Sequence, residues 1–97
     1  MTLDPIIRGK LEQTIDNVKQ AIQKPISSFD EKKRVEMNVK NKEDFALGLA
    51  LGIIIQDFYN QFFFMYTREP NQQEVLEVTS IIYRRSVEIH NAIFNIG

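Results

Sequence analysis

The sequence contains no cysteine, and this absence removes two classes of site at once. Neither a disulfide nor a zinc site built on thiolates can form. A chain without cysteine is typical of proteins in a reducing compartment, so we expect a cytoplasmic protein. The first residues also lack a basic segment that leads into an apolar run, and we therefore expect no signal peptide.

An excess of charge of one sign is also missing. The chain has 12 basic and 13 acidic residues, for a net charge of −1. A charge this small attracts neither nucleic acid nor an anionic membrane by itself. Basic residues do gather between positions 32 and 42, but acidic residues between positions 30 and 44 are interleaved with them. Phosphate binding needs a patch of one sign, so a nucleic-acid partner is not expected.

The longest apolar run is short. Residues 45–55 are apolar apart from two glycines, and Gln56 and Asp57 follow at once. A membrane-spanning helix needs about 20 consecutive apolar residues, whereas this run has 11. We therefore interpret it as part of a core helix and expect no membrane partner.

What is present fits one small helical domain covering residues 1–97, with 43% hydrophobic and 26% charged residues. The fold class expected is all-α or predominantly α, with three main helices. Asp4 and Pro5 are a typical cap and first residue of a helix, which we expect to end before Pro25. Its apolar residues recur every three or four positions, at Leu3, Ile7, Leu11, Ile15, Val18 and Ile22.

Two longer helices are predicted after it. One begins at the cap Asn41 and runs to about residue 68, before Pro70. The other begins at Asn71, with Glu74 as its capping-box partner, and runs almost to residue 97. The connection is so short that we expect these helices to form an antiparallel pair. The apolar stripe of the last helix consists of Val75, Thr79, Ile82, Ser86, Ile89, Ile93 and Ile96, widened by Leu76, Tyr83, Val87, His90 and Phe94.

Residues 26–40 allow two readings. Residues 34–40 alternate between polar and apolar, which favours a strand that pairs with residues 26–29 in a small β-hairpin. The alternative is a short helix opened by a capping box of Ser28 and Glu31.

The second helix has more apolar surface than its neighbours can cover. Helices that are apolar all round are normally buried all round, so we expect a homodimer or higher oligomer that pairs this helix with its own copy. Gly48 and Gly52 lie one turn apart and would let two backbones approach closely; alternatively, they only accommodate the first helix. The interface residues expected are Gly48, Leu49, Gly52, Ile53 and Phe64.

Histidine occurs once, at His90. Helical carboxylate–histidine metal sites place Glu and His three positions apart, whereas Glu88 and His90 are two apart and point in different directions. We expect a packed histidine, and neither a metal site nor a cofactor.

The string from Arg85 to His90, an arginine and a histidine separated by four residues, resembles the R-x4-6-H motif of the HEPN ribonucleases. Arg84 fits the same motif at a longer spacing. That family consists of helical bundles that dimerise and join the motifs of both protomers to cleave RNA. The resemblance implies that Arg85 contacts the scissile phosphate and that His90 is the acid or base. Ser86 departs from the Asn, Asp or His that usually follows the arginine.

Three functions follow from these observations. The one favoured is a non-enzymatic, homo-oligomeric interaction or scaffold module. The first alternative is the HEPN-like ribonuclease with Arg85 and His90. The second is a protein that binds a small apolar ligand in an aromatic pocket between the second and third helices.

Overall fold

The computed structural model describes residues 3–22 and 30–94, and every regular element among them is an α-helix. The helices are α1 (Pro5–Ala21), α3 (Glu31–Glu36), α4 (Lys42–Tyr66) and α5 (Gln72–Phe94). The all-α class is therefore confirmed. The molecule is elongated, with principal extents of 43 × 23 × 18 Å.

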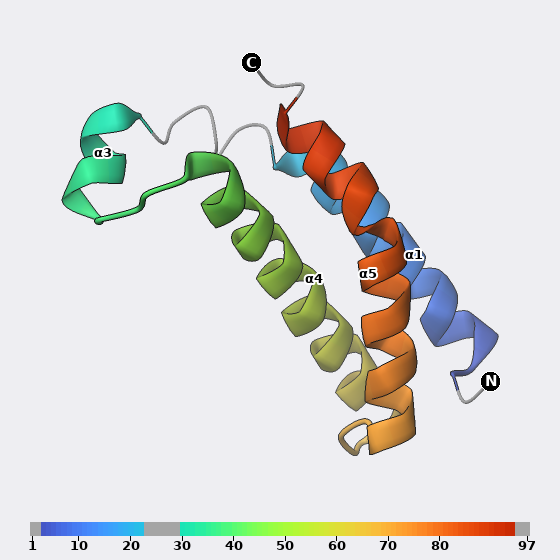
Figure 1. Ribbon diagram of the computed structural model, residues 1–97. Helices are drawn as coiled ribbons and strands as arrows, with labels where there is room; N and C mark the ends of the chain where they lie inside the picture. The colour runs from blue at the N-terminus through green and yellow to red at the C-terminus, as the bar shows by residue number, and fades with distance from the viewer. Residues whose placement is uncertain (1–2, 23–29, 95–97) are drawn as a thin grey trace.

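Three long helices form the body of the molecule. α4 leads away from α3 to the turn at residues 67–71, and α5 returns beside it in the opposite direction (Figure 1). α1 packs against both of them. The facing sides enclose one apolar core, which consists of Leu3, Ile7, Leu11, Ile15, Val18, Ile22, Ala46, Ala50, Ile54, Phe58, Phe62, Val78, Ile81, Ile82, Ile89 and Ile93.

α1 begins as its first residues predict. The Asp4 carboxylate accepts a hydrogen bond of 2.8 Å from the backbone N–H of Ile6, and Pro5 occupies the first helical position. The apolar stripe from Leu3 to Ile22 is buried along its whole length. A one-sided apolar helix of this kind is held by packing rather than by its intrinsic propensity.

A reciprocal cap closes the turn between α4 and α5. Asn71 accepts from the backbone N–H of Glu74, and the Glu74 carboxylate accepts from the N–H of Asn71, both at 2.8 Å. Arg68 donates two further bonds to this carboxylate, at 2.9 and 3.1 Å, and its guanidinium lies 4.9 Å from the centre of the Phe62 ring. The turn is therefore fixed to the end of the core by one buried carboxylate and one arginine.

The prediction of a strand over residues 34–40 is wrong. Residues 31–36 are helical, and residues 37–40 form a turn in which Asn38 has a left-handed φ of 59°. The local reason is the Asp30 carboxylate, which accepts from the backbone N–H of Lys33 at 2.9 Å and caps a helix here. No strand among residues 3–22 and 30–94 offers the ladder that the alternating pattern would need.

The alternative prediction of a short helix is confirmed for residues 31–36, although its cap differs. The cap is Asp30, however, whereas the expected cap Ser28 and the expected hairpin partner at residues 26–29 lie outside the described residues. Arg34 closes the turn after α3 by donating to the carbonyl of Val39 at 2.6 Å. The alternation of polar and apolar residues therefore reflects a short helix and turn on the surface.

α5 buries Ile82, Ile89 and Ile93 of its predicted apolar stripe, but the stripe widens on the opposite side from the one predicted. Leu76, Tyr83 and Val87 were expected to widen the apolar stripe, but they are 61%, 67% and 63% exposed. Val78 and Ile81 are buried instead. α5 packs on both α1 and α4, and these two neighbours lie on the side of Val78 and Ile81. Leu76, Tyr83 and Val87 thus form an apolar ridge on the outside of α5.

Two neighbouring isoleucines test this core. Ile7 is fully buried, whereas Ile6 is 63% exposed in the same turn of α1. Replacing a buried isoleucine with alanine removes apolar contacts and leaves a cavity. Ile7→Ala should lower the free energy of unfolding by about 2–5 kcal/mol, as measured by urea denaturation at one fixed protein concentration.

The matched control is Ile6→Ala, which should change the free energy of unfolding by no more than about 0.5 kcal/mol. Equal effects of the two substitutions would show that α1 does not bury this side.

Candidate interaction surface on α4

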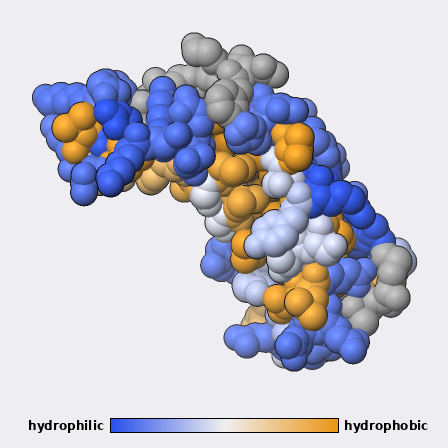
Figure 2. All heavy atoms as spheres, in the orientation of Figure 1, coloured by the Kyte–Doolittle hydropathy of each residue, from blue (hydrophilic) through white to orange (hydrophobic). Residues whose placement is uncertain are grey.

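α4 has an inner and an outer face with different roles. The inner face repeats every four residues and contains Ala46, Ala50, Ile54, Phe58 and Phe62, all buried. Ala46 and Ala50 therefore belong to the core. The outer face remains apolar and open to solvent, as the space-filling view shows along α4 (Figure 2). Its large exposed side chains are Leu49, Ile53, Ile55, Tyr59, Phe63 and Phe64.

The two glycines of α4 face solvent. A Cβ atom built on Gly48 or Gly52 would meet no atom within 4 Å. The alternative in which these glycines accommodate the first helix is therefore wrong. Glycine inside a helix costs about 1 kcal/mol relative to alanine, so α4 carries this cost twice without a packing reason among residues 3–22 and 30–94.

Four of the five residues predicted for the interface line one hollow. Gly48, Leu49, Gly52 and Ile53 form its floor and sides. It has a volume of about 510 Å³ and is completed by the polar side chains of Gln56, Asp57 and Asn60. The fifth residue, Phe64, lies apart from it near the end of α4 and is 86% exposed.

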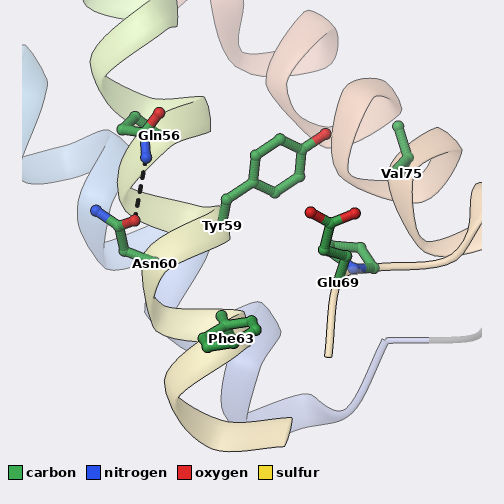
Figure 3. Close-up of a pocket in the computed structure, with 7 residues that line it drawn as sticks. Gln56, Tyr59, Asn60, Phe63, Glu69 and Val75 are labelled. Carbon is green, nitrogen blue, oxygen red and sulfur yellow. Dashed lines mark hydrogen bonds between the residues drawn. The ribbon is translucent and has the colours of Figure 1, made fainter. Parts of the chain in front are cut away.

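A second hollow opens where α4 approaches the turn to α5 (Figure 3). Its apolar lining consists of Tyr59, Phe63, Pro70 and Val75, and it also has a volume of about 510 Å³. Tyr59 projects from α4 toward α5 across this space, and the carboxylate of Glu69 lies nearby (Figure 3). This is where the sequence predicts an aromatic ligand pocket, although only two aromatic residues line it.

The amides on the outer face bond to each other. Gln56 donates to Asn60 at 3.0 Å, and both residues border the two hollows (Figure 3). Asp57 and Gln61, one position further round the helix, face α1 instead. The Asp57 carboxylate accepts from the Thr14 hydroxyl at 2.6 Å and from the Gln61 amide at 2.5 Å. The polar side of α4 is thus divided between an outer pair and an inner contact with α1.

Arg85 lies between α1 and α5, where it is only 14% exposed. It donates to Glu88 at 2.9 and 3.0 Å and to Asp16 at 2.5 Å, and it reaches the backbone carbonyl of Glu12 at 3.2 Å. These carboxylates hold the pKa of Arg85 above its usual value. Arg85 and the bond from Lys19 to Glu88, at 2.8 Å, lower the pKa of Glu88 to about 2. The guanidinium therefore joins two helices.

The HEPN-like motif does not converge within one chain. Arg85 and His90 are five positions apart, which separates their directions by roughly 140° around α5. His90 is half-buried. A composite site across two chains would first have to open the ion pairs that Arg85 makes with α1. Among residues 3–22 and 30–94, no group of three His, Cys, Asp or Glu side chains is arranged to hold a metal ion.

The ion pairs of Glu88 predict an acid-sensitive contact between α1 and α5. Because the folded pKa of about 2 lies below the ordinary value of 4.5, the stabilisation is complete above pH 4.5 and is lost as the pH falls toward 2. Glu88→Gln should therefore lose less of its stability than the wild type between pH 5 and about 2.5. The urea midpoints at these two pH values measure the effect.

Glu36→Gln removes an exposed carboxylate on α3 and is the control for this experiment. This variant should lose as much stability between pH 5 and about 2.5 as the wild type does, as measured by the urea midpoints. If Glu88→Gln does the same, the pairs with Arg85 and Lys19 contribute nothing in solution.

No protein-family model matches the chain, and neither does any curated protein sequence or any solved structure.

Proposed function

We propose that the protein is a non-enzymatic interaction module that assembles with itself through the outer face of α4. The observation that carries this proposal is the open apolar face with Gly48 and Gly52 in its floor. It combines large exposed side chains with two helical glycines that no contact with another described residue requires. Both features are unfavourable in an isolated molecule, and both are accounted for by a second helix packed on this face.

The size of the face supports a protein partner. Burying an aromatic side chain removes about 150–250 Å² from water. Tyr59, Phe63 and Phe64 are 38%, 56% and 86% exposed, so these three alone offer roughly 350 Å². A standard interface buries about 800 Å² on each partner, and the neighbouring aliphatic side chains add to this sum. The whole chain exposes 6461 Å², against about 5,800 Å² for a compact monomer of its mass.

A lipid bilayer is the other environment that could cover an apolar helix. By length and composition, α4 is the one described helix that could cross a membrane, and 22% of its most apolar 18-residue window is buried. However, α1 and α5 pack beside α4 and would have to enter the bilayer with it. Their outer sides carry charged residues such as Lys10, Asp16 and Arg84, and each charge at the bilayer centre costs about 2.5–3.5 kcal/mol or more.

We therefore favour an aqueous, cytoplasmic setting and a second copy as the partner. A symmetric dimer needs one self-complementary face, and the outer face of α4 has both hollows and projecting side chains. The role that follows is structural, a small scaffold that becomes functional on assembly.

Gly52→Leu tests the proposal, because the side chain fits the single chain but obstructs a close second helix. The fold should persist, since no described residue lies within 4 Å of the new Cβ. Self-association should weaken at least about tenfold, and light scattering on a size-exclusion peak should show the mass fall from dimer to monomer.

Gly9→Leu is the matched control, because Gly9 of α1 is equally open and lies outside the proposed interface. It should keep the wild-type mass. A wild-type monomer would contradict the proposal. So would a dimer that survives Gly52→Leu but dissociates on Leu76→Asp, since the interface would then lie on the outer ridge of α5.

A further inference from the structure

We propose that the two copies pair with their α4 helices antiparallel, and that α3 of each copy covers the hollow at the α4–α5 turn of the other. This inference rests on the proposed function, because it specifies how the second copy binds. It follows from three observations: the change in side-chain size along α4, the isolated position of α3, and the distribution of charge.

Side-chain size changes along the outer face of α4. The first half carries Gly48, Leu49 and Gly52 around a hollow, whereas the second half carries Tyr59 and Phe63. A parallel pair would place glycines against glycines and rings against rings, leaving space at one end and crowding at the other. An antiparallel pair sets the glycines of each copy against the larger side chains in the second half of the other outer face, which approaches the close packing that interfaces share with protein interiors.

One register fits this arrangement. In this register, the two-fold axis of the dimer crosses α4 at the level of residue 54. Leu49 then lies level with the partner's Tyr59, and Gly52 lies level with the partner's Gln56. The amides of Gln56 and Asn60 then lie level with the partner's Gly52 and Gly48, which leave space for them. Polar side chains within an apolar seam favour the register that satisfies their hydrogen bonds, so this pair selects one alignment.

α3 is the part of the chain that a single copy leaves unsupported. It has six residues and buries none of them, and it projects away from the three long helices (Figure 1). Isolated helices shorter than about 12–15 residues are marginal in water. Val35 and Met37 are 63% and 56% exposed here, and the space-filling view shows a separate apolar patch on α3 (Figure 2). These features are those of a segment that packs on another molecule.

The antiparallel register places this segment over a suitable surface. Lys42, the first residue of α4, lies level with the partner's Tyr66, so the preceding residues reach the partner's turn at residues 67–71. The second hollow opens at that turn and offers Phe63, Pro70 and Val75 to apolar side chains.

Charge favours the same orientation. Residues 31–42 carry five basic residues against two acidic ones, Glu31 and Glu36, and the hollow carries the carboxylate of Glu69. An antiparallel pair brings this basic segment near the partner's Glu69. A parallel pair would bring the two basic segments together, and juxtaposed like charges oppose association.

A charge exchange tests the contact of α3. Lys40→Glu and Glu69→Lys should each weaken dimerisation roughly three- to tenfold at low salt, because each replaces an attraction with a repulsion. The double variant should recover most of the wild-type affinity, as measured by the concentration dependence of the mass. Arg84→Glu, a charge reversal on the outside of α5, should have no effect. Failure of the double variant to recover would overturn the placement of α3.

Disulfide cross-linking tests the orientation, and the absence of native cysteine makes every bridge assignable. One chain carries Leu49→Cys, and a second chain with a longer tag carries Tyr59→Cys. The two chains are refolded together and oxidised mildly. Residues 49 and 59 are about 15 Å apart along α4, whereas a disulfide needs Cα atoms within about 7 Å. The antiparallel pair should therefore give bridges between the two different chains, which the tag distinguishes on a non-reducing gel.

A dimer that forms only bridges between two Leu49→Cys chains would be parallel and would overturn this inference while leaving the proposed function intact. A dimer without any bridge would overturn this arrangement, and it would overturn the proposed function as well if Gly52→Leu left the dimer mass unchanged. A monomer, detected by light scattering before oxidation, would overturn the proposed function itself. Circular dichroism of each single variant, at these exposed positions, confirms that the helices are retained.

Discussion

The structure depends on the four-residue repeat along the inner face of α4. Because an α-helix advances 100° per residue, residues four apart drift slowly round its surface, and the repeat from Ala46 to Phe62 gives one continuous contact for α1 and α5. The small alanines lie at one end of this contact and the two phenylalanines at the other. The whole core is organised round a helix that remains apolar on its opposite side as well.

Polar contacts then fix how the neighbouring helices sit on α4. Thr14 binds Asp57 at the α1–α4 contact, Arg85 joins α1 to α5, and Glu74 holds Arg68 at the turn between α4 and α5. Each contact pairs opposite charges or satisfies a hydrogen bond where the helices meet, so it specifies orientation more than it adds stability. With the helices fixed in this way, the apolar outer face of α4 cannot turn inward. This constraint leaves the outer face of α4 open to solvent.

Much of the fold follows from local signals in the sequence. Asp4 and Pro5 start α1, Asn71 and Glu74 form the cap of α5, and the regular stripe of α1 marks its buried side. The prediction of a strand over residues 34–40 is wrong because alternation of polar and apolar residues indicates a strand only where a partner strand exists. Thr14 was not recognised as a contact of α4, although it lies between Leu11 and Val18 at the spacing of the buried stripe.

The sequence by itself determined where the long helices begin, which residues are apolar, and that α4 is apolar on more than one side. These properties depend on neighbours within a few positions along the chain. Only the tertiary structure decided which apolar residues are covered: Val78 and Ile81 are buried, Leu76, Tyr83 and Val87 are exposed, and nothing packs on Gly48 or Gly52. Burial depends on how many helices reach a given side, and that is set by how whole helices pack, which no local pattern contains.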